Sequence, residues 1–141
     1  MSANPHFPHL ASPMALGNVT VRNRLVFQPH FTALPTANGM PSPELCAYHV
    51  ERARGGAGLI VDGNMAVMQE GTESRHVLAA WDPRVVPLYA PMTEQIHGRG
   101  AKVFGQLTHA GHDSLERPPH LLWGPTQMAE PSSNFATKAM D

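Results

Sequence analysis

The sequence lacks the features that mark several protein classes. Its only cysteine, Cys46, cannot form a disulfide within the chain, which favours a reducing cytoplasm. Ten Lys+Arg stand against 11 Asp+Glu, and a net charge of -1 gives no electrostatic basis for binding nucleic acid. No apolar run approaches the roughly 20 residues that cross a bilayer, and residues 1–10 lack the apolar segment of a secretory signal. We therefore expect a soluble cytoplasmic protein with neither a nucleic-acid nor a membrane partner.

What the chain does contain is enough for one folded unit. Of its 141 residues, 42% are hydrophobic, which is ordinary for a globular protein and too high for a disordered one. Residues 1–13 are rich in proline and histidine and are predicted to be a mobile leader. Residues 14–141 are predicted to form the domain.

Short β-rich runs alternate with turn residues along this domain. Residues 14–21 are predicted to form a hairpin around the Gly17-Asn18 turn. Residues 25–27, 59–61 and 102–107 are predicted strands. The continuous apolar character of 59–61 is typical of a parallel strand that is buried on both faces.

Two helices are predicted between these strands. Ser42 is a candidate N-cap with proline directly after it, and residues 43–54 have helical apolar spacing. A second helix follows Asp82, but Pro87 and Pro91 lie within its apolar stripe. Either this helix is kinked, or it begins near Leu88 so that Pro91 stays in the first turn. The order of strands and helices predicts an α/β fold with a parallel sheet.

The connections are long after strands and short after helices. The helix-to-strand turns are 55–57 and 98–101, and the strand-to-helix loops are 28–41, 63–81 and 108–136. Ordinary connections in such folds have about 2–6 residues, and longer ones usually have a function. We therefore expect a functional site at the carboxyl ends of the strands.

Few residues carry an obvious chemistry. Gln106 is a polar residue inside an apolar strand. Its amide can bond to neighbouring backbone or, because it both donates and accepts, pair with the edge of a flavin or pyrimidine; the residues alone leave both open. His109 and His112 have no third ligand at a suitable spacing, so no metal site is predicted. Cys46 is expected to be a small buried side chain rather than a nucleophile.

Five stretches together carry a resemblance to a known family, in matching order and spacing from about Ser12 onward: 16–26, 51–60, 97–103, 106–111 and 124–126. They resemble the Old Yellow Enzyme / NADH:flavin oxidoreductase family. The match is closest to the branch of 2,4-dienoyl-CoA reductases and trimethylamine dehydrogenase-like enzymes.

The resemblance implies a (β/α)8 TIM barrel with FMN at the carboxyl ends of its strands and the hairpin at the barrel floor. The implied cofactor-binding residues are Pro29, His30, Phe31, Gly63, Asn64 and Gln106. Phe31 stands where trimethylamine dehydrogenase-like members have a cysteine joined to the flavin, so the FMN is expected to be non-covalent. His112 stands where many members have an arginine.

The resemblance also implies that much of the barrel is missing. A barrel of this kind takes about 250 residues, whereas this chain supplies a hairpin, about three strands and two helices. We expect it to be the N-terminal part of such an enzyme, inactive alone and able to associate with itself through open sheet edges. A proton donor is not identified, so the catalytic residues are unknown. Any iron–sulphur cluster would lie in a missing C-terminal part.

The activity implied for the parent enzyme is hydride transfer from NAD(P)H through FMN to an enone or dienoyl-type small molecule, or amine oxidation. The alternative is a non-catalytic, truncated remnant with weak or no flavin binding.

Overall fold

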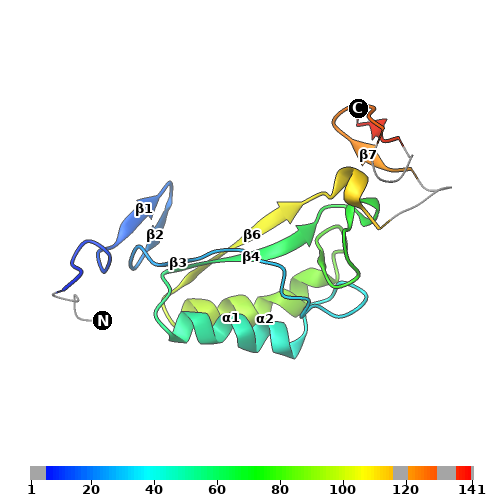
Figure 1. Ribbon diagram of the computed structural model, residues 1–141. Coiled ribbons are helices and arrows are strands. Elements are labelled where there is room, and N and C mark those ends of the chain that lie inside the picture. The colour runs from blue at the N-terminus through cyan, green and yellow to red at the C-terminus, as the bar shows by residue number, and fades with distance from the viewer. Residues whose placement is uncertain (1–5, 116–120, 130–135, 141) are drawn as a thin grey trace.

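The computed structural model describes residues 6–115, 121–129 and 136–140 (Figure 1). In chain order the elements are β1 (Met14–Leu16), β2 (Val19–Val21), β3 (Val26–Phe27), α1 (Pro43–Arg54), β4 (Leu59–Ala66), the 3-10 turn η1 (Gln69–Gly71), β5 (Leu78–Ala79), α2 (Val85–Gly98), β6 (Lys102–Thr108), the 3-10 turn η2 (Gly111–Asp113), β7 (Trp123–Gly124) and β8 (Lys138–Ala139). The predicted succession of hairpin, strands and helices is confirmed.

A parallel sheet forms the centre of the fold. Strand β4 pairs with β3 and β5 along one edge and with β6 along the other, and all three pairings are parallel. The sheet is therefore open, and the described strands do not close into a barrel. This confirms the predicted α/β class.

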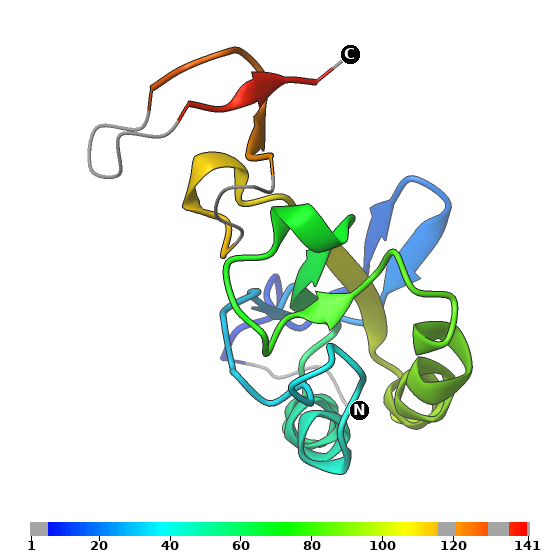
Figure 2. The same cartoon turned by 90° about the vertical axis from the view of Figure 1, so that its right-hand side faces the viewer.

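Both helices cover the same face of the sheet. Figures 1 and 2 show α1 and α2 side by side against it, while the opposite face has no helix over it among the described residues. Apolar side chains from the helices and strands pack between these layers as the main core: Leu45, Val50, Ala53, Ile60, Met65, Leu78, Met92, Ile96 and Ala101. Burial of the apolar side chains that α1 and α2 contribute to this core, rather than intrinsic helix propensity, supplies most of the helices' stability.

Helix α1 begins and ends where its sequence predicts. The Ser42 hydroxyl accepts a hydrogen bond from the backbone N–H of Leu45 at 3.0 Å and donates to the carbonyl of Leu34 at 2.7 Å. The serine thereby caps the helix and ties it to the loop that follows β3. The helix ends at Arg54, directly before Gly55.

Helix α2 contains both of its prolines. Because it spans Val85–Gly98, the predicted start near Leu88 is wrong. Pro87 lies in the first turn, where backbone N–H groups have no helical partner, so it removes no hydrogen bond. Pro91 lies inside the helix and does remove one. The buried contacts of Met92 and Ile96 with the core keep the helix continuous through this position.

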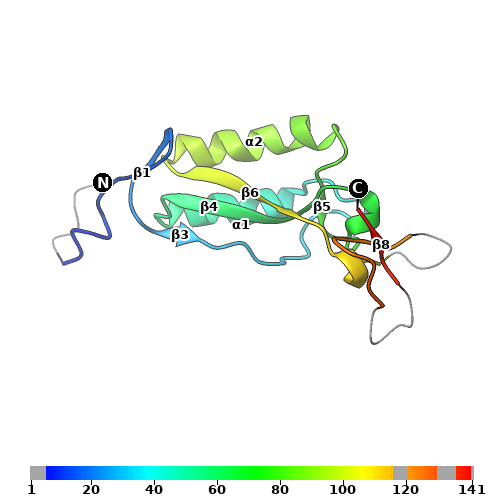
Figure 3. The same ribbon diagram turned by 90° about the horizontal axis from the view of Figure 1, so that it is seen from above.

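The residues after the β1–β2 hairpin bond to both helices at the end of the fold where the parallel strands begin. Figure 3 shows the hairpin at the end where the parallel strands begin, opposite β8. The guanidinium of Arg22 donates to the carbonyls of Ala53, Ala57 and Arg99, at 2.9, 3.0 and 2.6 Å, beside the C-terminal ends of both helices. Arg22 therefore joins the C-terminal ends of the two helices. Asn23 donates to the carbonyl of Gly56 at 2.8 Å.

Strand β4 is longer than its apolar run. It continues past 59–61 to Ala66, so Gly63 and Asn64 lie within the strand. The prediction that the loop begins at Gly63 is therefore wrong. The pairing with β6 shifts register between Asp62 and Met65, and the Gly63–Asn64 peptide bond is cis. The two long loops beyond β4 and β6 also contain short elements that the sequence did not indicate: η1, β5, η2 and β7.

The predicted leader is partly described. Residues 6–12 form turns, and the N–H of Arg24 donates to the carbonyl of Leu10 at 2.9 Å. The mobility of residues 1–13 stays a prediction. In the described part of the chain, neither helix has the length and apolar character needed to span a membrane.

Candidate functional site

Three of the predicted site residues meet at the carboxyl half of the sheet. An ideal Cβ placed on Gly63 would lie 2.5 Å from Gln106 Oε1, 3.0 Å from Gln106 Cβ and 3.2 Å from Pro29 Cβ. Gly63 comes from β4, Gln106 from β6, and Pro29 from the segment directly after β3. Three neighbouring strands thus bring these residues together, and the contact leaves no space for a side chain at position 63.

This group lies on the face of the sheet that has no helix. Asp62, the residue before Gly63, points to the helices, because its carboxylate contacts His49 of α1 and Tyr89 of α2. Successive residues of a strand point to opposite faces, so Gly63 and its contact Gln106 belong to the other face. Gln106 is exposed and makes no hydrogen bond to any described residue. Its amide is free to donate and to accept.

The other predicted site residues have different surroundings. The ring of His30 faces α1, where its Nε2 lies 2.7 Å from the Tyr48 hydroxyl oxygen. The Asn64 amide donates to the carboxylate of Glu73 in the following loop. Phe31 is 49% exposed. The side chains of His30 and Asn64 are therefore engaged away from Gln106, which leaves mainly their backbone for a ligand at this site.

A buried polar group of Asp62, His49 and Tyr89 lies on the opposite, helix-covered face of the sheet. Asp62 is fully buried, its Oδ2 accepts from the Tyr89 hydroxyl at 2.7 Å, and its Oδ1 lies 2.8 Å from His49 Nε2. Burial raises the pKa of Tyr89, and the Asp62 charge and hydrogen bond raise it further, so the hydroxyl stays protonated and donating. One carboxylate in the middle strand thus joins both helices to the sheet.

The Asp62–His49–Tyr89 group is not among the sequence-based predictions, although the sequence contains a signal for it. Asp62 directly follows an apolar run, and a carboxylate in a strand that is buried on both faces needs partners. The identity of those partners depends on tertiary packing, because His49 and Tyr89 lie on different helices.

The loops beyond the strands are joined to each other above the site. The N–H of Ala110 donates to the carbonyl of Gly71 at 2.8 Å, so the loop after β6 is bonded to the loop after β4. Side-chain polar atoms of Glu73 (Oε2), Thr108 (Oγ1) and His109 (Nε2) are buried here with no partner among the described residues. Among those residues no three His, Cys, Asp or Glu side chains group as metal ligands would.

Comparison with known proteins identifies the family. Residues 9–141 match the NADH:flavin oxidoreductase / NADH oxidase family. The chain belongs to this family. The resemblance inferred from the sequence motifs is therefore confirmed.

Individual relatives agree with this assignment. The chain is 38% identical over 110 residues to an NADH oxidase of Thermoanaerobacter brockii, covering 77% of this chain and 17% of the relative. It is 33% identical over 107 residues to an NADPH dehydrogenase of Listeria welshimeri, covering 75% and 32%. The Old Yellow Enzyme homologue of Zymomonas mobilis has the same fold, with a TM-score of 0.77 at 22% identity over 95% of this chain and 40% of that one. The chain thus spans less than half the length of each relative.

The residues of the site are compatible with the flavin of this family. A flavin has a flat ring system whose pyrimidine edge both donates and accepts hydrogen bonds, and Gln106 offers an amide that can do both. Gly63 has no side chain that would rise from the strand into the space beside that amide. Pro29 adds an apolar surface next to both.

Proposed function

We propose that this chain supplies the first part of the FMN site of an oxidoreductase that uses NAD(P)H as its reductant. The substrate would be an enone or dienoyl-type small molecule, or an amine oxidised in the opposite direction. The observation that carries the proposal is the meeting of Pro29, Gly63 and Gln106 on the helix-free face, at the carboxyl half of three parallel strands. Family membership supports the choice of cofactor.

Within this proposal, Gln106 orients the pyrimidine edge of the cofactor through its free amide. Gly63 and Pro29 form the surface beneath the ring, and the exposed ring of Phe31 extends that surface. His30 and Asn64 contribute backbone, since their side chains bond to Tyr48 and Glu73. Bound FMN would supply the two-electron redox chemistry, which the protein orients and tunes. Phe31 has no nucleophilic atom, so the cofactor would be held without a covalent bond.

In this proposal the chain contributes residues beneath the flavin ring, and other parts of the barrel contribute the phosphate-binding loops. The phosphate-binding loops of such barrels typically follow strands seven and eight, so the chain alone is expected to be inactive. An iron–sulphur cluster, if the enzyme has one, would belong to the same missing part. A single cysteine supports a cytoplasmic location.

A second candidate is a non-catalytic remnant that associates with itself. The helix-free face and its ends expose apolar side chains, among them Val26, Phe31 and Phe104. The outer edge of β6 has no strand partner among the described residues. Exposed strand edges favour pairing with a further chain.

An experiment that completes the barrel distinguishes the FMN-site proposal from the non-catalytic remnant. The chain is substituted for the matched segment of the Listeria welshimeri NADPH dehydrogenase, and FMN binding is measured by quenching of flavin fluorescence. We expect the chimera to purify with bound FMN, whereas the chain alone binds it weakly or not at all. Gln106→Ala in the chimera should weaken FMN binding about tenfold, because one hydrogen-bonded amide is lost.

Gln95→Ala is the matched control, since Gln95 is an exposed amide on α2, away from the sheet. The proposal is refuted if Gln106→Ala binds FMN as tightly as the Gln95 variant. A chimera that folds but stays free of FMN, while the chain alone forms oligomers, would favour the remnant.

A further inference from the structure

A cavity lies between the loops that follow β3 and β4. Its volume is about 550 Å³, which lies in the range of small-molecule sites. Its walls come from the turn after β3, from η1 and the residues after it, and from the turn before α2. The residues that matter to the argument are Asn38, Ser74, Arg75, Trp81, Asp82 and Arg84.

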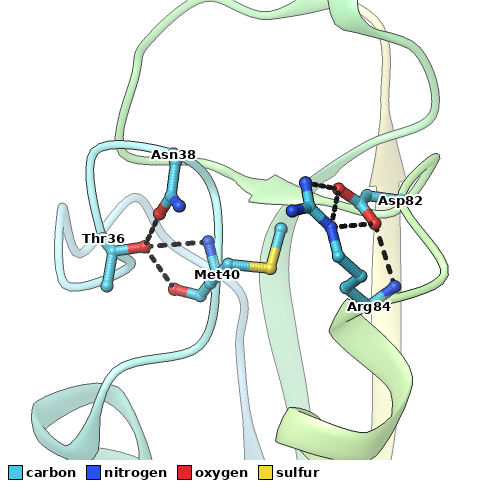
Figure 4. Close-up of polar contacts among 5 residues, drawn as sticks. All are labelled: Thr36, Asn38, Met40, Asp82 and Arg84. Carbon is cyan, nitrogen blue, oxygen red and sulfur yellow. Dashed lines mark hydrogen bonds and ion pairs between the residues drawn. The ribbon is translucent and has the colours of Figure 1, made fainter.

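The wall formed by residues 36–40 is held in one conformation. The Thr36 hydroxyl donates to Asn38 Oδ1 at 2.5 Å and accepts from the N–H of Met40 at 3.0 Å (Figure 4). The carbonyl of Gly39 accepts from the N–H of Ala79 at 2.9 Å, which fixes the turn to β5. Because Asn38 Oδ1 is already used, the amide nitrogen of Asn38 is left as a donor.

Among the described residues around the cavity, one cation has no ionic partner. Asp82 and Arg84 form a forked ion pair, with Arg84 Nε 2.9 Å and Nη2 2.5 Å from Asp82 Oδ2 (Figure 4). The pair is neutral overall, and the arginine keeps the pKa of Asp82 below its usual value. Arg75 has no ion pair with any described residue. Ser74 Oγ accepts from the N–H of His76 at 3.1 Å, so the serine O–H remains a donor.

An aromatic surface completes the cavity. Trp81 is 37% exposed and contributes to the lining, where an indole can stack on a flat ring. A guanidinium with nearby hydroxyl and amide donors is a set that suits phosphate oxygens. An adjacent indole suits a base.

We propose that this cavity binds a nucleotide, with its phosphates at Arg75, Ser74 and Asn38 and its base against Trp81. Both a free nucleotide and the adenylate half of a pyridine dinucleotide carry this combination of phosphates and a base. The site would be separate from the one that Gln106 and Gly63 form, and its occupation needs no bound flavin.

Isothermal titration calorimetry of the 141-residue chain with ADP tests this proposal. We expect saturable binding with one site per chain that weakens as salt is raised, because the ligand is an anion. Arg75→Gln should lower the ADP affinity at least about tenfold, since a charge-assisted contact is lost. Trp81→Leu should weaken the binding of ADP but not that of inorganic pyrophosphate. The same titration with NADH tells the two sources apart, since tighter binding of NADH than of ADP would indicate the dinucleotide.

Arg54→Gln is the matched control, because it also removes one exposed arginine but lies on α1, outside the cavity lining. The proposal is overturned if ADP does not bind saturably, or if the Arg75 and Arg54 variants bind ADP equally. If Trp81→Leu lowers the affinity for ADP and for pyrophosphate equally, the proposed stacking of the base on Trp81 is wrong.

Discussion

The hydroxyl of Tyr89 should contribute more stability than its half-buried position suggests. It donates at 2.7 Å to the carboxylate of Asp62, which is 0% exposed and whose other close side-chain partner among the described residues is His49. Tyr89→Phe leaves the ring in place and removes this one bond. Because a hydrogen bond to a buried charged group contributes about 1.5–3 kcal/mol, we expect a loss of about 2 kcal/mol in the free energy of unfolding.

Tyr48→Phe is the matched control. Its hydroxyl also makes one hydrogen bond of 2.7 Å, to His30, but the contact is exposed and both partners can bond to water instead. Its removal should cost at most about 1 kcal/mol. Urea unfolding followed by circular dichroism measures both variants, and with a slope of about 2 kcal/mol per M the midpoint of Tyr89→Phe should fall by about 1 M.

The pH dependence adds a second measurement. Burial and the Asp62 charge raise the pKa of Tyr89 in the folded chain, whereas in the unfolded chain it titrates near 10. Above about pH 10 the unfolded state loses this proton while the folded state keeps it, so stability falls as pH rises. Tyr89→Phe lacks this loss, so its difference from the wild type should be largest near neutral pH and shrink above pH 10. Equal destabilisation of the Tyr89 and Tyr48 variants, or a difference independent of pH, would refute the reasoning.

Three further outcomes are expected. Gly63→Val should abolish FMN retention in the completed barrel, because its Cβ alone would lie 2.5 Å from Gln106 Oε1; unchanged flavin content after purification would contradict this. Ser42→Ala should cost about 1 kcal/mol of stability by removing the cap of α1, measured by thermal unfolding. Arg84→Gln should return the lowered pKa of Asp82 toward 3.8, which NMR titration of the carboxyl group detects. An Asp82 pKa that does not move would mean that the ion pair is absent in solution.

Elements with local signals could be predicted well from the sequence. The limits of α1 depend on a serine cap, a proline at the first position and a Gly-Gly stop, all of which act within a few residues. The hairpin likewise depends on Gly17, whose positive φ of 57° suits the turn. The parallel sheet followed from the alternation of strands and helices.

Elements that depend on distant partners could not be predicted in this way. Strand β4 continues past Gly63 and Asn64 because β6 pairs with it on both sides of them, at Asp62 and at Met65, whereas these residues resemble a strand end when considered alone. The same applies to the site. Pro29, Gly63 and Gln106 were proposed together through family resemblance, but that the His30 ring faces Tyr48 follows only from where α1 packs.

Two consecutive residues of β4 serve opposite sides of the sheet. Asp62 anchors the helical layer, and Gly63 forms the floor beneath the Gln106 amide. A single peptide unit therefore connects the helical layer to the surface proposed to bind FMN. A substitution of His49 or Tyr89, which hold Asp62 from the two helices, is accordingly expected to shift that surface without contacting it. Efforts to redesign the ligand preference of such a barrel can accordingly start from its outer shell.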